Sequence, residues 1–124
     1  MSKTRSPDVP FRAASLEELA PLFDLCKAGK LFDVQRWIEE GKPVNPPAEK
    51  RKHGKFKSPL LVAIDRGFHS LADVLLQGGA VQEPDDVDSP MSRAIGMKRR
   101  DLVELLVEYG YRPESVEMTW VFAS

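Results

Sequence analysis

The heptapeptide Ser58-Pro-Leu-Leu-Val-Ala-Ile64 recurs as Ser89-Pro-Met-Ser-Arg-Ala-Ile95, 31 residues further along the chain. Two more features return at nearly the same interval, since Leu75-Leu76 recurs as Leu105-Leu106 and Gly79 recurs as Gly110. Several anchors in one register indicate an internal repeat, and a period of this length is typical of stacked structural units.

A first copy of the unit lies upstream. Ala20-Pro21-Leu22 followed by Leu25-Cys26 fits the same pattern, and Gly29 and Gly41 have the spacing of Gly67 and Gly79. The connection to the second unit is about seven residues longer than the next connection. The sequence therefore predicts repeats at about 20–45, 57–82 and 88–113, with an enlarged link at 46–57.

Within each unit, apolar residues follow the i, i+3, i+4 spacing of helices in two short runs. The first runs are Leu22, Leu25 and Cys26; Leu60, Ala63 and Ile64; and Met91, Ala94 and Ile95. The second runs are Val34, Trp37 and Ile38; Leu71, Val74 and Leu75; and Leu102, Leu105 and Leu106. Ser-Pro pairs suit helix starts, and Gly41, Gly79 and Gly110 suit helix ends. Each unit is predicted to be a helix hairpin with an extended link, stable only when stacked on its neighbours.

This pattern resembles the ankyrin repeat, whose signature begins Thr-Pro-Leu-His-x-Ala. The resemblance extends from about residue 20 to the C-terminus and implies an all-α solenoid with extended or β-hairpin links. The chain departs from the signature where Phe23, Leu61 and Ser92 replace the histidine. It departs again at Lys98, which stands where Gly29 and Gly67 mark the turn between helices.

The two ends of the chain differ from the repeats. Residues 1–14 are polar and proline-containing, so we expect a flexible leader before a repeat domain at 15–124. Ser15-Leu-Glu-Glu18 matches a capping box, but Pro21 predicts a short turn there rather than one continuous helix.

Residues 117–124 match the start of a fourth repeat. We expect a longer protein or an apolar end covered by a second copy or a partner; alternatively, Trp120 and Phe122 fold back as a cap.

Composition limits the class of protein. The 124 residues fit one domain, and 42% hydrophobic and 30% charged residues with a net charge of −1 argue against disorder and against a strongly basic protein. No apolar run reaches the roughly 18 residues of a membrane span, and the N-terminus lacks a secretory signal. Cys26 has no disulfide partner. We expect a cytoplasmic protein that does not bind membranes.

Catalytic chemistry has few candidates in this sequence. It contains no phosphate-binding loop, nucleophile elbow or histidine pair at metal-ligand spacing. We interpret His53 and His69 as solvated, Cys26 as a buried inert thiol and Trp37 as a core residue. The sequence predicts a protein without catalytic residues, cofactor or metal.

The links carry opposite charges. The basic link holds Lys50, Arg51, Lys52, Lys55 and Lys57, and the acidic link holds Glu83, Asp85, Asp86 and Asp88. The basic link is either a site for nucleic acid or an acidic partner, or a mobile, solvated loop that the acidic link partly neutralises. We favour the second interpretation because the net charge is near zero, which also disfavours nucleic acid as the partner.

The ankyrin resemblance also implies a surface for binding another protein, formed by link tips and the concave side of the first helices. The positions that match this surface are Lys27, Ala28, Lys55, Lys57, Asp65, Arg66, Asp86, Asp88, Gly96 and Met97. Alternatively, these side chains are simply the solvent face of a solenoid. The leading hypothesis is a non-enzymatic interaction module or scaffold whose partner the sequence does not identify.

Overall fold

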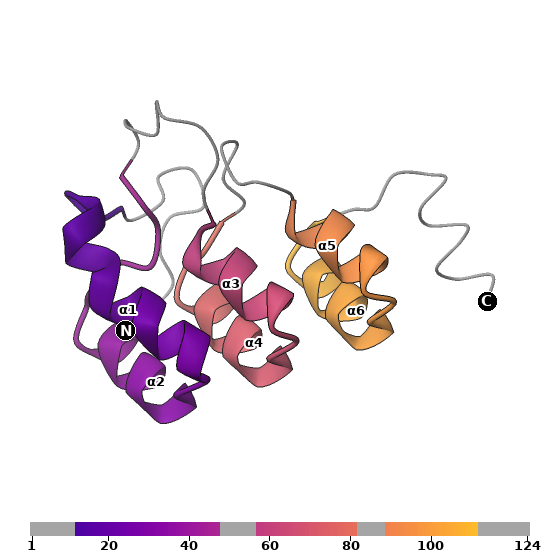
Figure 1. Ribbon diagram of the computed structural model, residues 1–124, viewed down its shortest axis with the longest axis horizontal. Coiled ribbons are helices and arrows are strands. Elements are labelled where there is room, and N and C mark those ends of the chain that lie inside the picture. Colours follow the sequence, from indigo (N-terminus) through magenta and orange to yellow (C-terminus); the bar gives the residue numbers. More distant parts are fainter. Residues whose placement is uncertain (1–11, 48–56, 82–88, 112–124) are drawn as a thin grey trace.

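The computed structural model describes residues 12–47, 57–81 and 89–111, and this part of the chain is all-α, as predicted. It contains six helices and no strand: α1 Leu16–Ala28, α2 Leu31–Glu39, α3 Pro59–Asp65, α4 His69–Gln77, α5 Pro90–Gly96 and α6 Arg100–Glu108. Each odd-numbered helix pairs with the next one as a hairpin (Figure 1). The predicted partial repeat at 117–124 and most of the enlarged link lie outside the described residues.

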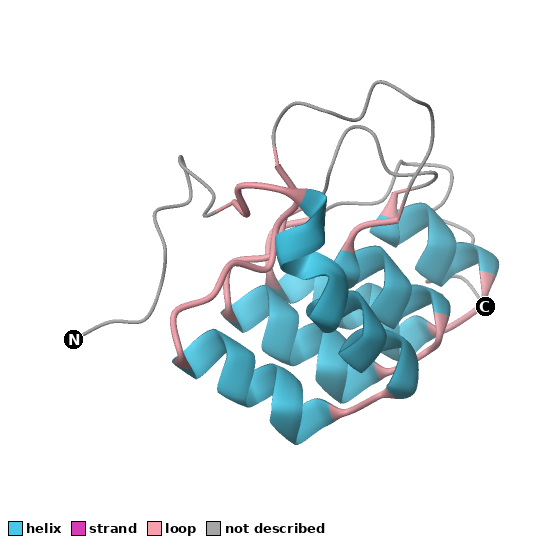
Figure 2. Cartoon of the chain, turned by 60° about the vertical axis from the view of Figure 1, so that its left-hand side comes forward, coloured by secondary structure: helices cyan, strands magenta, loops and turns pink. Residues whose placement is uncertain are grey.

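The hairpins lie side by side in chain order. Helix α3 contacts both α1 and α5, and α4 contacts both α2 and α6, which gives one layer of first helices and one of second helices (Figure 2). All the residues of the predicted apolar runs are buried or packed against the core between these layers. The helical spacing read from the sequence is therefore confirmed for all three hairpins.

The predicted Ser-Pro helix starts are also confirmed. The hydroxyl oxygen of Ser58 accepts a hydrogen bond from the Leu61 N–H at 3.2 Å, and that of Ser89 accepts one from the Ser92 N–H at 3.0 Å. Pro59 and Pro90 occupy the first helical turn, where a missing N–H costs no helical hydrogen bond. Helices α3 and α5 therefore begin at equivalent positions.

Helix α1 begins earlier than its counterparts, and the predicted turn near Pro21 is wrong. Ala20 replaces the capping serine at this position, so no side chain there can start a helix. Ser15 caps the helix instead, because its Oγ accepts from the Glu18 N–H at 3.2 Å while Glu18 Oε1 accepts from the Ala14 N–H at 2.7 Å. The helix continues through Pro21 and is 13 residues long, against 7 for α3 and α5.

The end of the predicted leader is packed against the first link, so the flexible description does not hold for residues 12–14. Ala13 is buried and its N–H donates to the Asn45 carbonyl oxygen at 2.8 Å. The buried Asn45 side chain in turn donates to the Gly79 carbonyl oxygen at 2.9 Å and accepts from the Val81 N–H at 3.0 Å. These hydrogen bonds tie the start of the domain and the first two links together.

Candidate functional site

The exposed side of the first-helix layer brings equivalent positions of the three hairpins together. Lys27, Asp65 and Gly96 occupy one row across α1, α3 and α5, and Ala28, Arg66 and Met97 occupy the next row. Asp65 and Met97 are partly buried, and the other four residues are exposed. The structure thus gathers seven of the ten predicted surface residues on the first-helix side, counting Lys57 beside Asp65. Lys55, Asp86 and Asp88 lie outside the described residues.

Asp65 is the electrostatic centre of this surface. Its Oδ2 accepts a hydrogen bond from Lys57 Nζ at 2.6 Å, and its Oδ1 lies 3.3 Å from Arg93 Nη1. The hydrogen bond from Lys57 lowers the pKa of the Asp65 carboxyl, and the positive charges of Lys57, Arg93 and Arg66 lower it further. The carboxylate therefore stays ionised at neutral pH and holds two cations, Lys57 from the enlarged link and Arg93 from the third hairpin.

Arg93 was not predicted as part of the surface. The repeat register held the signal, because Arg93 corresponds to Val62 and therefore lies one turn before the position equivalent to Asp65. A cation displaced by one turn from a carboxylate on the adjacent helix is within reach of it.

A groove lies between α1 and the start of α3. Its wall on α1 consists of Leu16, Ala20, Phe23, Asp24 and Lys27, and its opposite wall consists of Lys57 and Val62. We call this set the α1/α3 groove; its volume is about 510 Å³, within the usual range of ligand sites. An adjoining hollow also borders Lys27, Lys57 and Val62 and continues past Asp65 to Arg66 and Phe68.

The apolar wall of this groove was missed in the sequence because a turn was expected near Pro21. Leu16 and Ala20 belong to the part of α1 that precedes Pro21, and α3 has no counterpart to it. The signal that could have revealed it was the spacing of Leu16, Ala20, Phe23 and Lys27 at i, i+4, i+7 and i+11. That pattern needs one continuous helix.

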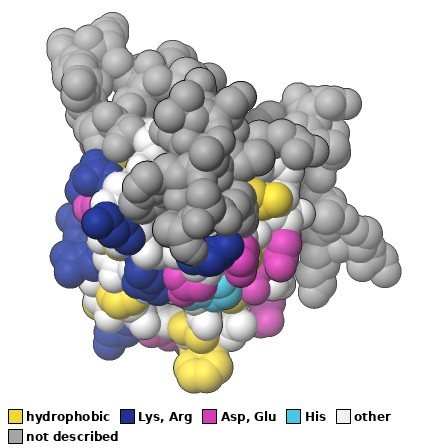
Figure 3. Space-filling model, turned by 90° about the vertical axis from the view of Figure 1, so that its right-hand side faces the viewer, with side chains coloured by type: hydrophobic (Ala, Val, Ile, Leu, Met, Phe, Trp, Pro, Cys, Tyr) yellow, Lys and Arg dark blue, Asp and Glu magenta, His cyan; other side chains and the backbone are white. Residues whose placement is uncertain are grey.

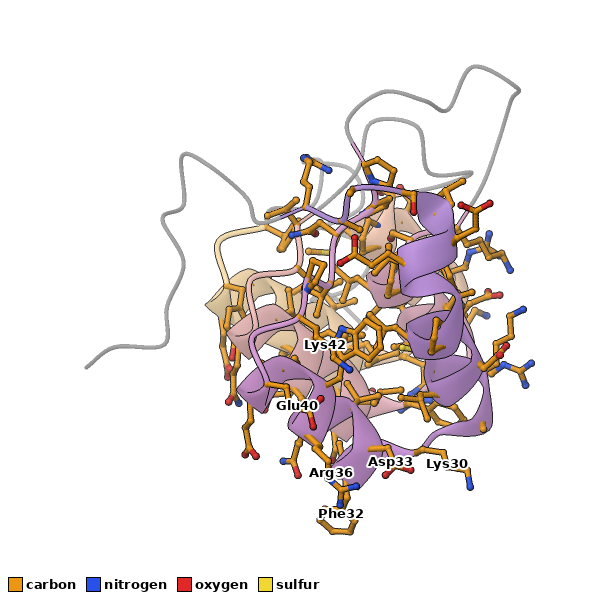
Figure 4. The ribbon with its side chains drawn as sticks, turned by 90° about the vertical axis from the view of Figure 1, so that its left-hand side faces the viewer. Lys30, Phe32, Asp33, Arg36, Glu40 and Lys42 are labelled. Carbon is orange, nitrogen blue, oxygen red and sulfur yellow. The ribbon has the colours of Figure 1, made fainter. Side chains whose placement is uncertain are left out.

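The second-helix layer carries two notable aromatic side chains, Phe32 and Trp37 on α2. Figure 4 shows Phe32 pointing away from α2 into solvent, and 77% of this residue is exposed. Lys42 Nζ lies 4.8 Å from the centroid of the Trp37 ring, whose Nε1 donates to the Pro43 carbonyl oxygen at 2.7 Å. Trp37 is therefore a core residue, as predicted. At the α5 and α6 end of the molecule, Lys, Arg, Asp and Glu side chains are interspersed with hydrophobic ones (Figure 3).

The described parts of the chain contain one free cysteine. Cys26 is fully buried, and its burial raises the pKa of the thiol to about 12, which agrees with the predicted inert thiol. Across residues 12–47, 57–81 and 89–111, no three His, Cys, Asp or Glu side chains are grouped in a way that could hold a metal ion. The chemistry assembled on the first-helix side is instead that of ion pairs beside apolar surface.

No protein-family model matches the chain, and no curated protein matches its sequence. None of the helices in the described ranges combines the length and the apolar character of a membrane span.

Proposed function

We propose that this chain is a non-enzymatic protein-interaction module of the ankyrin-repeat type, which binds a partner protein through the exposed side of α1, α3 and α5. The observation that carries this proposal is the alignment of Lys27, Asp65, Arg66 and Met97 across three successive first helices. Side chains in fixed rows on a packed scaffold present a constant shape and charge pattern, which is what a specific protein interface needs.

The chemistry of the rows supports binding through polar and apolar contacts together. Asp65 holds Lys57 and Arg93 in place, whereas Lys27 and Arg66 form no ion pair within 4 Å with the other described residues. Arginine and methionine are enriched at protein interfaces relative to the rest of protein surfaces, and Arg66 and Met97 occupy the same row. We also propose a cytoplasmic location, because the one cysteine has no disulfide partner.

The experiment that tests the proposal changes Arg66 and Met97 together. The full chain is used to capture partners, each captured protein is identified, and its affinity for the purified chain is then measured. Arg66→Glu with Met97→Ser should weaken that affinity at least about tenfold while the chain stays folded, with a lower melting temperature because Met97 packs partly against the core. The matched control is Arg36→Glu with Phe32→Ser on α2, which should bind the partner as the wild type does. Full affinity in the first variant would contradict the proposal.

The alternative is an accessory protein that binds nucleic acid or an acidic partner through the basic link Lys50–Lys57. Of its five cations, only Lys57 lies within the described residues, and its ammonium group is engaged by Asp65. The two candidates differ in their response to salt. Nucleic-acid binding would weaken steeply as salt rises and would be lost when the link cations are changed to serine. Partner binding that survives those changes favours the interaction module.

A further inference from the structure

The α1/α3 groove exists because the two helices that border it have different lengths. α1 has five residues before Pro21, and α3 begins at the equivalent Pro59, so Leu16 and Ala20 extend past the start of α3. Leu16 is 45% exposed, and no first helix lies on the far side of α1 among the described residues. This places apolar side chains where the regular hairpin packing leaves them uncovered.

Charge is unevenly distributed along the groove. Leu16, Ala20 and Phe23 make one end apolar, with Asp24 as the carboxylate beside them. Lys27 and Lys57 make the other end basic, Arg66 continues it into the adjoining hollow, and Arg93 adds a fourth cation through Asp65. Four cations thus face two carboxylates, and both oxygens of Asp65 are already engaged by Lys57 and Arg93. The basic end has an excess of positive charge next to an apolar surface.

From this polarity we infer that the groove binds a short peptide segment of a partner protein that has apolar side chains at one end and carboxylates at the other. The inference rests on the proposed function and specifies the chemistry of the partner. Apolar side chains would cover Leu16, Ala20 and Phe23, and the carboxylates would pair with Lys27 and Arg66. Burial of apolar area supplies affinity, and complementary charge places the acidic end of the segment at the basic end of the groove.

The length of the groove sets the spacing within the segment. Leu16 and Lys27 are eleven residues apart on one helix, which at 1.5 Å per residue corresponds to about 16 Å along α1. An extended peptide advances about 3.3 Å per residue, so the apolar side chain that covers Leu16 and the carboxylate that pairs with Lys27 should be about five residues apart.

The test is a selection of peptides from a random twelve-residue phage-displayed library on the full chain. The enriched sequences should contain apolar residues and Asp or Glu at the spacing given above, with the same order in all of them. A synthetic peptide of the consensus sequence is then titrated by fluorescence anisotropy. Lys27→Glu with Arg66→Glu should weaken its binding at least about tenfold, since like charges then face each other. Leu16→Ser should weaken it about threefold to tenfold while leaving the fold intact, because this side chain is only partly covered.

The matched controls on α2 are Arg36→Glu and Phe32→Ser, which change the same residue chemistry on another face. Both should bind the consensus peptide as the wild type does. Enrichment of basic or uncharged peptides overturns the inference, as does a consensus peptide that binds the groove variants with full affinity. Self-association of the chain that Leu16→Ser abolishes also overturns it, because a second copy would then occupy the groove.

Failure of the inference and failure of the proposed function give different results. A captured partner whose binding depends on Arg66 and Met97 but not on Leu16 and Lys27 leaves the interaction module standing and removes the groove. If no peptide is enriched and no captured partner depends on Arg66 and Met97, both the inference and the proposed function are contradicted.

Discussion

Arg99 Nη2 donates a hydrogen bond to the carbonyl oxygen of Gly67 at 3.3 Å and so ties the turn of the third hairpin to the turn of the second. Asp101 holds the guanidinium group in place through Nε and Nη2, at 3.0 and 2.9 Å. Phe68 has the equivalent position one repeat earlier, and its ring lies against Gly29. The residue that follows each turn thus contacts the turn of the preceding hairpin, by a hydrogen bond in one case and by an aromatic ring in the other.

The contact predicts unequal effects for two glycine substitutions. Gly41 and Gly67 both have positive φ, at 83° and 75°, so alanine should cost each about 1 to 2 kcal/mol in backbone strain. A Cβ on Gly67 would also lie 2.5 Å from Arg99 Nη1, whereas one on Gly41 would meet no atom within 4 Å. Gly67→Ala should therefore cost about 0.5 to 1.5 kcal/mol more than Gly41→Ala in urea unfolding. The excess should disappear in an Arg99→Ala background, and equal costs in the wild type would contradict the contact.

The hairpins and their caps were predictable because the signals are local. Ser58 and Ser89 bond N–H groups three residues away, and the buried faces follow from helical spacing within single helices. The start of α1 was not predictable in the same way. There, Pro21 costs the helix a hydrogen bond, whereas the cap at Ser15 and the burial of Leu19 and Leu22 stabilise the longer helix. The balance between these effects depends on tertiary packing, which the local sequence does not specify.

Only those surface residues that occupy equivalent positions of the repeats could be predicted from the sequence. Lys27, Asp65 and Arg66 were placed on it because equivalent positions of stacked hairpins must lie on one side. The pairing of Asp65 with both Lys57 and Arg93 depends on where flexible side chains of a link and a neighbouring helix end, which no single helix specifies. The groove depends on the length of α1 and was therefore missed with it.

Removing a core side chain should test the assignment of the second helices. Leu75 is fully buried on α4, so Leu75→Ala should lower the free energy of unfolding by about 2 to 5 kcal/mol. Phe32→Ala on α2 removes a larger side chain that is 77% exposed and should change it by less than about 0.5 kcal/mol. A loss below about 1 kcal/mol for Leu75→Ala would mean that the buried face of α4 is wrong.

Asp65 should contribute to stability in a pH-dependent way. Its pKa is lowered in the folded chain, so its contribution is present above the unfolded value of about 3.9 and is lost as the pH falls through the folded value. Asp65→Asn should therefore destabilise the chain at pH 7 and flatten the acid limb of the stability profile. Asp33→Asn makes the same change in charge at a longer, more exposed ion pair with Arg36, at 3.8 Å, and should destabilise less at pH 7. Equal stability of Asp65→Asn and the wild type at pH 7 would contradict the role of Asp65.

The Cys26 thiol should report on the opening of the core and on alkaline stability. Burial raises its folded pKa to about 12, whereas an unfolded thiol ionises near pH 8.5. The contribution of the buried thiol to the free energy of unfolding is therefore complete below pH 8.5. It declines above that pH, because only the unfolded chain releases the thiol proton. The free energy of unfolding of the wild type, measured at a series of pH values, should fall by about 1 to 2 kcal/mol between pH 8.5 and 10. This fall should be absent from Cys26→Ala. Tyr109, whose pKa is also raised to about 12, affects stability only above its usual value of 10, so this window isolates the thiol.

In the same pH range, a disulfide reagent should modify the native thiol far more slowly than the thiol of the chain unfolded in urea. Parallel pH profiles of the wild type and Cys26→Ala, or rapid native modification, would show that the thiol is not enclosed between α1 and its neighbours.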